Sequence, residues 1–242
     1  MSSTRIEIRV HRTTAQRGQD ALTTAGRMPA LRSHGRRYNL CVSKLLALFP
    51  LDVVLFPDAP LPLHIFEPRY KEMIRDLLES REPFGVVRTA GSGIEQVGCT
   101  AEIVAVAKQY EDGRLDIVTE GRQRFEIVQV DMGKTYLRAE VLYIVDEPDH
   151  PLQEDVARLL EMQKEMLELL GANAEVPDAD DRQLTLTIAA AMPFDLEMKQ
   201  KLLASRSEPQ RMTALIEYYE KVLPTLRRAV KARHKAGGNG HV

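Results

Sequence analysis

The stretch Leu48–Tyr70, LFPLDVVLFPDAPLPLHIFEPRY, carries five prolines in an otherwise apolar run, at positions 50, 57, 60, 62 and 68. Each proline fixes its own φ and disfavours helical geometry in the residue before it. Each also lacks the N–H that a central strand would donate, so the stretch predicts short edge strands joined by rigid turns. The charged residues Glu67 and Arg69 come at the end of the stretch, where a helix can begin and run to about Glu79.

A β meander is predicted after this helix, because extended segments alternate with turn residues. The expected strands are Phe84–Arg88, Val97–Tyr110, Leu115–Thr119, Gln123–Val130 and Tyr136–Val145. Asp112-Gly113 predicts a two-residue hairpin of type I′, in which both central residues have positive φ. Gly121 predicts a further turn, and Phe125 a core contact. Adjacent antiparallel strands of this kind usually curl into a barrel or a sandwich.

The segment Asp146–Pro151 marks a boundary, because the periodicity beyond it is helical. Apolar residues form one stripe along Leu152–Leu170, and Gly171 should end this helix. Three further helices are predicted, with candidate caps at Asp180 with Gln183, at Asp195, and at Ser207 with Gln210. Pro224 should end or kink the last of them, since a proline inside a helix costs about 3 kcal/mol.

These segments resemble the N-terminal substrate-recognition domain of the Lon protease family. Within the proline-rich stretch the matching pieces are Phe49–Leu51, Leu55–Pro57 and Leu61–Tyr70. Further matches follow in order at Phe84–Val87, Val97–Ile103, Asp112–Leu115, Gly121–Phe125, Tyr136–Val141 and Leu186–Leu203. The resemblance covers roughly residues 45 to 223. It implies an α+β fold, in which a PUA-like β pseudo-barrel over residues 44–147 precedes a helical bundle over 148–235 and a frayed tail over 236–242.

The first 43 residues are basic and lack apolar periodicity, so we expect them to be disordered. They hold eight arginines against two acids, whereas the remainder has 25 basic and 33 acidic residues, a net charge of about −8. Three interpretations stay open. The first is a start assigned too far upstream, with the real start at Met28 or near Val42. The second is a flexible basic arm for acidic partners or nucleic acid, and the third is an organellar transit peptide.

Composition excludes several classes of protein. The sequence has no apolar run near the ~20 residues of a membrane-spanning helix and no secretory signal. Cys41 and Cys99 are therefore read as reduced thiols of a cytoplasmic protein. The sequence also lacks the G-x-x-x-x-G-K-[ST] motif of a phosphate-binding loop and the H-E-x-x-H and C-x-x-C motifs of common zinc sites. We expect no enzyme, no cofactor and no metal, and we interpret Gly91–Gly93 as a loop and the aspartates of 178–181 as solvated charges.

The candidate peptide-binding residues lie at the corner between strand and helix: His64, Phe66, Glu67, Arg69 and Tyr70. Two interpretations of His64 are open, a buried hydrogen-bonded residue, which we favour, and a pH-sensitive contact. Glu67 and Arg69 can form a local ion pair worth ~0–1 kcal/mol when exposed, or they can line a peptide groove.

By the resemblance, the chain is expected to be a non-catalytic module that binds unfolded or client polypeptides, in a groove or at a sheet edge. A protease or a chaperone is a further candidate partner, no membrane contact is expected, and oligomerisation is left open. The alternatives are an RNA-binding PUA-like protein and an accessory subunit of an ATP-dependent protease. The negative charge of the folded part makes nucleic acid an unfavourable ligand.

Overall fold

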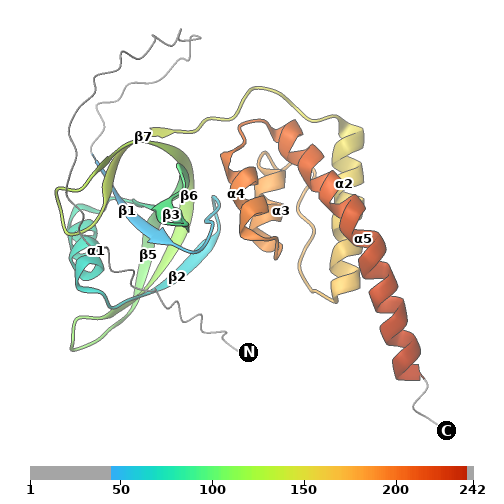
Figure 1. Cartoon of the computed structure of the whole chain (residues 1–242), viewed down its shortest axis with the longest axis horizontal. Helices are drawn as coiled ribbons and strands as arrows, with labels where there is room; N and C mark the ends of the chain where they lie inside the picture. The colour runs from blue at the N-terminus through green and yellow to red at the C-terminus, as the bar shows by residue number, and fades with distance from the viewer. Residues whose placement is uncertain (1–44, 239–242) are drawn as a thin grey trace, which may run out of the picture. The chain divides into compact units, whose positions relative to one another are not determined.

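The computed structural model describes residues 45–238, which form seven strands and five helices (Figure 1). The predicted basic tail and Cys41 lie outside the described residues. Within this range no helix is long and apolar enough to cross a bilayer. The α+β class predicted from the sequence is confirmed, with the strands first and most of the helices after them.

Five of the strands close into a small barrel. In ring order they are β1 (Leu46–Leu51), β7 (Arg138–Tyr143), β6 (Leu115–Asp131), β5 (Val97–Gln109) and β3 (Phe84–Ala90). The ring closes because β1 pairs in parallel with β3, whereas all other strand pairs are antiparallel. Two more strands lie off this ring: β2 (Pro60–Ile65) pairs with β6, and β4 (Gly93–Ile94) pairs with β3.

The side chain of Phe125 fills the barrel interior, as its predicted core role requires. It is fully buried in a cluster with aliphatic residues of β1, β3 and β7. Two glycines make room for its ring, because a Cβ on Gly85 would lie 2.6 Å from the ring and one on Gly98 would lie 2.8 Å from it. Small residues in the wall therefore let one large residue occupy the centre.

A second core lies outside the barrel wall, beneath helix α1 (Pro68–Ser80). The buried face of α1 consists of Tyr70, Met73, Ile74 and Leu77. Phe49 of β1 meets this face, with its ring centroid 4.1 Å from that of Tyr70. These four residues recur at helical spacing, so they form one packed face of α1.

Strand β1 corrects the expectation that the proline-rich stretch forms only edge strands. Its first two residues pair with β7, and Leu48–Leu51 pair with β3. The N–H of Leu48 donates to the Leu137 carbonyl on the β7 side, at 2.8 Å. Backbone N–H groups two residues apart in a strand face the same side, so the nitrogen of Pro50 also faces the β7 side. At Pro50, however, β1 is no longer paired with β7. Pro50 therefore removes no ladder hydrogen bond.

Strand β6 also differs from the prediction, because it continues through Gly121 where a turn was expected. The φ of Gly121 lies outside the left-handed region, so conformation is not the reason for glycine here. A Cβ at this position would lie 2.0 Å from the Phe56 carbonyl oxygen. The Gly121 N–H donates to the Ala59 carbonyl, and its own carbonyl accepts the Asp58 N–H, both at 2.9 Å. Glycine is needed because the proline-rich loop packs directly on the strand.

The hairpin at Asp112-Gly113 forms where predicted but uses a different turn. Gly113 has a φ of 77°, whereas the φ of Asp112 is not positive. The Gly113 N–H donates to the Tyr110 carbonyl, and the Tyr110 N–H donates to the Arg114 carbonyl, both at 2.9 Å. This is a three-residue loop with a glycine bulge, which requires positive φ at one residue only.

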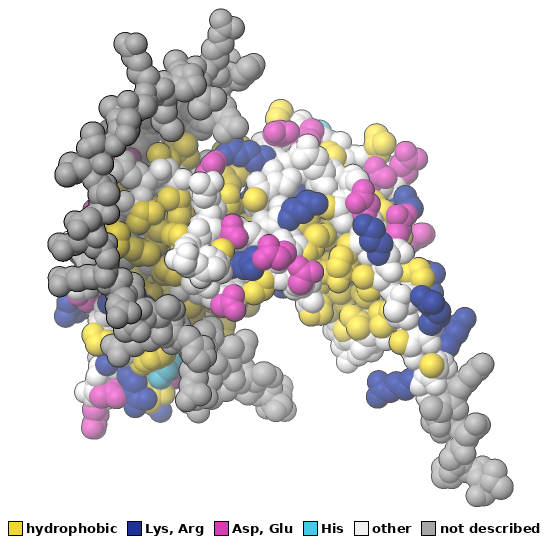
Figure 2. Space-filling model, in the orientation of Figure 1, with side chains coloured by type: hydrophobic (Ala, Val, Ile, Leu, Met, Phe, Trp, Pro, Cys, Tyr) yellow, Lys and Arg dark blue, Asp and Glu magenta, His cyan; other side chains and the backbone are white. Residues whose placement is uncertain are grey.

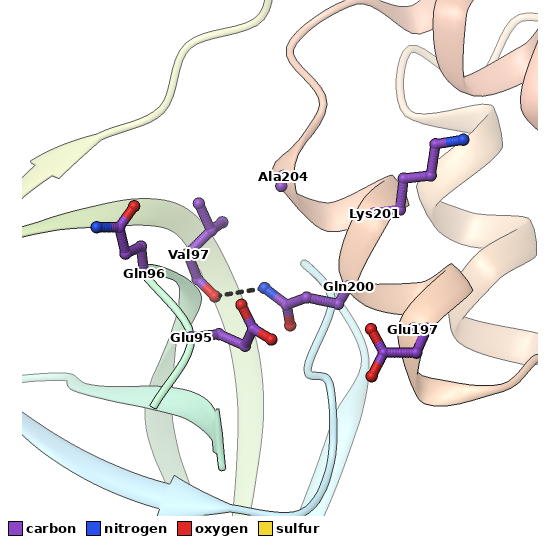
Figure 3. A pocket seen from close by; sticks show the side chains of 7 residues that line it. All are labelled: Glu95, Gln96, Val97, Glu197, Gln200, Lys201 and Ala204. Carbon is purple, nitrogen blue, oxygen red and sulfur yellow. Dashed lines mark hydrogen bonds between the residues drawn. The ribbon is translucent and has the colours of Figure 1, made fainter. Parts of the chain in front are cut away.

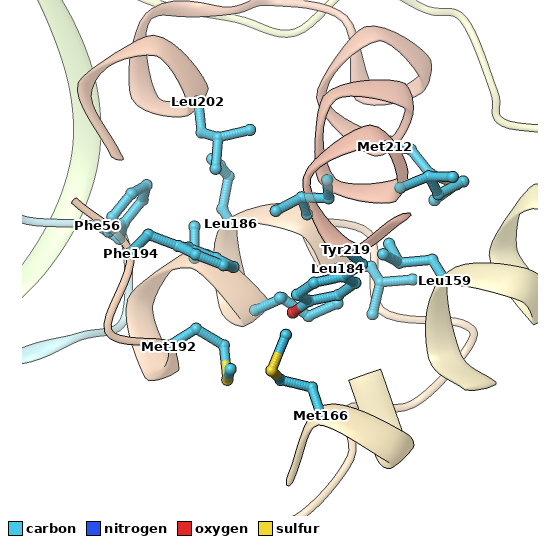
Figure 4. Packing of buried hydrophobic residues seen from close by; sticks show 14 of the residues in the cluster. Phe56, Leu159, Met166, Leu184, Leu186, Met192, Phe194, Leu202, Met212 and Tyr219 are labelled. Carbon is cyan, nitrogen blue, oxygen red and sulfur yellow. The ribbon is translucent and has the colours of Figure 1, made fainter. Parts of the chain in front are cut away.

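Four helices pack together after β7: α2 (Gln153–Leu170), α3 (Leu184–Ala191), α4 (Leu196–Ala204) and α5 (Glu208–Gly238). Their shared core includes Leu159, Phe194 and Tyr219 (Figure 4). Phe56, from the loop between β1 and β2, belongs to the same cluster and is almost fully buried. The barrel and the helices therefore share hydrophobic packing through this loop.

The helix ends confirm most of the predicted caps. Gly171 ends α2 with a φ of 64°, and the side chains of Asp195 and Ser207 each accept the backbone N–H three residues on. The cap of α3 was placed wrongly, because Gln183 occupies the N-cap position and its side chain makes no capping bond. Asp181 rather than Asp180 accepts the Gln183 N–H, at 2.8 Å, in the turn before the helix. Adjacent aspartates in a loop are equivalent in sequence, and only the backbone path decides which one faces the helix.

Helix α5 passes through Pro224, so of the two alternatives, a helix end or a kink, the helix end is wrong. Leu223, just before the proline, is buried against the other helices. Just after it, Arg227 binds both carboxylate oxygens of Glu165 on α2. These contacts hold both sides of the helix in place and offset the missing proline N–H.

The end of α5 has a basic surface (Figure 2). Its exposed basic side chains are Arg227, Arg228, Lys231 and Arg233. The helix reaches Gly238, inside the tail that was predicted to fray from residue 236.

Candidate functional site

Strand β5 has one unpaired edge within residues 45–238. Cys99–Ala101 lie between β3 and β6, but from Glu102 to Gln109 the strand pairs with β6 alone. An unpaired edge presents a row of backbone N–H and C=O groups that another extended chain can use.

Valines are exposed along this edge and beside it. Val104 and Val106 are 56% and 42% exposed, and Val118 on β6 is also exposed. Two bulges interrupt the pairing of β5 with β6, between residues 103 and 105 and between 106 and 108. Bulges increase the local twist of a strand, and a twisted edge pairs less readily with strands of other molecules. The edge of β5 is therefore accessible, but its twist restricts which chains can pair with it.

His64, Asp116 and Lys108 lie opposite one another across β2, β6 and β5. The His64 Nδ1–H donates to Asp116 Oδ1 at 2.5 Å, and the Tyr110 hydroxyl donates to Asp116 Oδ2 at 2.8 Å. These two bonds, that from His64 first, hold the pKa of the Asp116 carboxyl below its usual value. His64 is hydrogen-bonded, as favoured from the sequence, but it is exposed rather than buried.

Two aromatic rings flank His64 at this corner. The Phe66 ring stacks 6.0 Å from the imidazole, and the Tyr110 ring meets it edge-on at 5.8 Å. Phe66 is 47% exposed. Lys108 and Arg114 lie over the Tyr110 ring, 4.4 Å and 4.9 Å from its centroid. An exposed apolar side chain, Phe66, therefore lies near two cationic side chains, Lys108 and Arg114.

We refer to the exposed residues of this region, together with half-buried Tyr110, as the hairpin surface: His64, Phe66, Val104, Val106, Tyr110 and Val118. His64 and Phe66 were predicted from the sequence, whereas Tyr110, Asp116 and the valines were not. The segment Val104–Ala107 alternates valine and alanine without the polar residues that an exposed strand face usually carries. That pattern could have indicated the apolar edge.

The other predicted residues lie at the start of α1. Glu67 accepts hydrogen bonds from Arg69, with the Nε at 3.1 Å and an Nη at 3.0 Å, so the expected local ion pair forms. The Arg69 guanidinium lies 4.5 Å from the Tyr70 ring centroid. Tyr70 is only 6% exposed, and burial raises the pKa of its hydroxyl. Tyr70 therefore supports the corner from the core, while Glu67 and Arg69 stay at the surface.

A buried polar network joins the barrel to the helices. Arg124 of β6 and Arg211 of α5 both bind the carboxylate of Asp146 in the linker after β7. Arg124 also donates to the carbonyls of Leu203 and Ser205 at the end of α4, at 2.9 Å and 2.6 Å. Burial alone would raise the pKa of Asp146, but the two arginines outweigh it and lower that pKa.

The same network holds the first turn of α3. The Glu208 carboxylate pairs with Arg211 and accepts the Thr185 N–H at 2.9 Å and the Thr185 hydroxyl at 2.8 Å. Both charged side chains are buried, so each depends on the other for its stability.

No cluster in residues 45–233 has the composition of a metal site or of a reactive thiol. These residues include no group of three or more His, Cys, Asp or Glu side chains placed to hold a metal ion. Cys99 is buried, and burial raises the pKa of its thiol to about 12. A thiol of that kind is inert at neutral pH.

Comparison with known proteins identifies the fold. Residues 45–221 match the family model described as the ATP-dependent protease La (LON) substrate-binding domain. The Lon protease of Cytophaga hutchinsonii is 25% identical over 201 residues, which are 75% of this chain and 25% of that protein. The Lon protease of Parabacteroides distasonis is 28% identical over 146 residues, 56% of this chain and 18% of that protein. The chain thus spans a quarter or less of the length of these relatives.

Two solved structures have the same fold. A Lon N-terminal domain protein from Xanthomonas campestris superposes with a TM-score of 0.60 at 23% identity, covering 73% of this chain and 99% of that one. The N-terminal domain of the Mycobacterium avium complex Lon protease gives 0.57 at 19% identity, covering 73% and 98%. With the family model matching nearly all of the described residues, the chain belongs to the LON substrate-binding domain family.

Proposed function

We propose that this chain is a non-catalytic adaptor that binds extended segments of client polypeptides at the free edge of β5. The observation that carries the proposal is the unpaired edge from Glu102 to Gln109, with Val104 and Val106 exposed along it. In strand addition the backbone hydrogen bonds supply affinity, and alternate side chains supply specificity. The family description, a substrate-binding domain, supports a polypeptide ligand.

The chemistry of the hairpin surface favours apolar client segments. Phe66, Val104 and Val118 offer apolar contacts, and the twisted edge limits pairing between copies of the chain. The net charge of about −8 over residues 44–242 works against a phosphate backbone, so RNA is the weaker proposal. The relatives that are named as proteases are at least four times longer than the part that matches, and for this chain we propose polypeptide binding without catalysis.

The test is the binding of fluorescein-labelled casein, an unfolded polypeptide, measured by fluorescence anisotropy. Val104→Lys places a charge on the edge and should raise the Kd about tenfold, the effect of losing the burial of one valine side chain. Val128→Lys is the matched control, because Val128 is 57% exposed on the part of β6 that pairs with β7. It should bind casein like the wild type.

Equal Kd values for the two variants would contradict the assignment of binding to the β5 edge. Circular dichroism of both variants checks that neither substitution alters the fold. Tight, salt-sensitive binding of RNA by residues 44–242 would favour the nucleic-acid alternative instead.

A further inference from the structure

A cleft of about 330 Å³ lies where α4 meets the start of β5, and its charges are matched within the chain (Figure 3). Both of its carboxylates face Arg88, with Glu197 at 2.5 Å from the guanidinium and Glu95 at 4.0 Å. Lys201 adds a further cation to the wall. The start of β5 therefore gives no reason to expect a charged ligand, and the other end of the strand differs in this respect.

The free edge of β5 carries a charge that the chain itself does not match. From residue 102 to residue 109 it has two charged side chains, Glu102 and Lys108. Glu102 accepts a hydrogen bond from Arg122 Nε at 2.7 Å, so its charge is matched. Lys108 makes no ion pair with a carboxylate of residues 45–233, and its Nζ lies 4.4 Å from the Tyr110 ring centroid. A strand that adds to this edge therefore meets a cation that is not yet paired.

The carboxylate opposite Lys108 is already occupied. Asp116 Oδ1 accepts a hydrogen bond from His64 at 2.5 Å, and its Oδ2 accepts one from Tyr110 at 2.8 Å. His64, Asp116 and Lys108 form one row across β2, β6 and β5, because directly opposite residues of neighbouring strands share a face. A strand added at the β5 edge extends this row by one residue, whose Cβ lies about 4.5–5.5 Å from that of Lys108.

We propose that the β5 edge selects client segments that place a glutamate or an aspartate opposite Lys108. Opposite charges directly across two strands attract one another, whereas like charges repel. Lysine has a flexible stem and three N–H donors, so Nζ can bind a carboxylate and keep one side against the Tyr110 ring. Lys108 is then a specificity-determining residue. The inference rests on the proposed function, and it adds an acidic position to an otherwise apolar client segment.

The overall charge of the protein works against this preference, which makes the preference diagnostic. The whole chain has a net charge of −2, and residues 44–242 have about −8. Long-range repulsion alone would thus favour a basic peptide, although charges more than about 10 Å apart are largely screened in 0.1 M salt. The arginines of residues 1–43 also attract an acidic peptide, so the test needs variants that change Lys108 alone.

The experiment measures the fluorescence anisotropy of two labelled peptides in 0.1 M NaCl. They are identical apolar, β-forming segments with a central glutamate or a central lysine. The full chain should bind the glutamate peptide about fivefold more tightly, as expected when a repelling cross-strand pair is replaced by an attracting one. Lys108→Gln should reduce this ratio to about twofold or less, and Lys108→Glu should reverse it. Lys164→Glu, on the exposed surface of α2, makes the same change in net charge as Lys108→Glu and should keep the ratio.

The outcomes separate this inference from the proposed function. If the wild type binds both peptides equally, or if Lys108→Gln keeps the fivefold ratio, the acidic preference is refuted while the edge proposal stands. If neither peptide binds, both are refuted. Loss of the ratio in Lys164→Glu would assign it to the net charge of the chain and overturn the inference. In 1 M NaCl, where the Debye length is about 3 Å, the ratio should fall to about twofold or less, and an unchanged ratio would contradict an ion pair.

Discussion

Replacing Gly121 by alanine should destabilise the protein strongly, although it adds a single methyl group. The added Cβ would lie 2.0 Å from the Phe56 carbonyl oxygen and 2.9 Å from the carbonyl carbon. Both are backbone atoms, so they cannot rotate away as a side chain can. To reach the 3.4 Å of an ordinary contact, the oxygen must retreat by 1.4 Å.

That retreat disturbs the two backbone hydrogen bonds that Gly121 makes with the proline-rich loop. Overpacking costs about 1–3 kcal/mol, and each weakened hydrogen bond adds up to about 1 kcal/mol. We therefore expect Gly121→Ala to lower the free energy of unfolding by about 2–5 kcal/mol. For a folded part of this size, each kcal/mol lowers the Tm by about 2–4 °C.

Urea unfolding at 25 °C, followed by circular dichroism, measures this loss. Gly93→Ala is the matched control, because Gly93 also lies in a strand, has no positive φ and has no atom closer than 3.9 Å to an added Cβ. It should change the free energy of unfolding by about 0.5 kcal/mol or less. If the two variants unfold at the same urea concentration, the close packing of the loop on β6 is refuted.

The buried charges between the barrel and the helices lead to further predictions. Arg211→Met leaves the buried Glu208 carboxylate without its cation and half-buried Asp146 with Arg124 alone, and it should cost about 3–5 kcal/mol, whereas Arg227→Met at the surface should cost about 1 kcal/mol or less. Equal urea midpoints would contradict this. Because the pKa of Asp146 is lowered in the folded state, its stabilising effect is complete above the unfolded pKa of about 4 and is lost as the pH falls toward the folded value. The urea midpoint of the wild type should therefore fall more between about pH 5 and pH 3 than that of Asp146→Asn, and parallel curves would disprove the link. Tyr219→Phe removes the hydroxyl that donates to buried Gln163 and should cost about 1–3 kcal/mol, while half-exposed Tyr143→Phe should leave the thermal midpoint unchanged.

Local sequence patterns located most of the elements, because turns and caps depend on neighbouring residues. Gly171 and Asp195 are examples, since each acts on the backbone within four residues of itself. The closure of the barrel could not be predicted in this way. It depends on the parallel pairing of Leu48 with Gly85, and alternation along a strand does not reveal its partner. Gly121 was misinterpreted for the same reason, because the atom that excludes a side chain belongs to Phe56.

The candidate site was predicted in part. The strand-to-helix corner placed His64 and Phe66 together, because both belong to one short motif. Asp116 and Tyr110 join them only through the register of β2 on β6 and the fold of the hairpin. A sequence pattern assigns an arginine to the surface by default, and so the burial of Arg211 could not be foreseen.

The position of Phe56 limits how this protein can be divided. The loop between β1 and β2 delivers Phe56 to the helical core, with Val54 and Ala59 packed against it. Separating the halves would expose Phe56 and the apolar residues that it covers, so the halves should melt in one cooperative transition. Expressed separately, each half should expose apolar surface and aggregate.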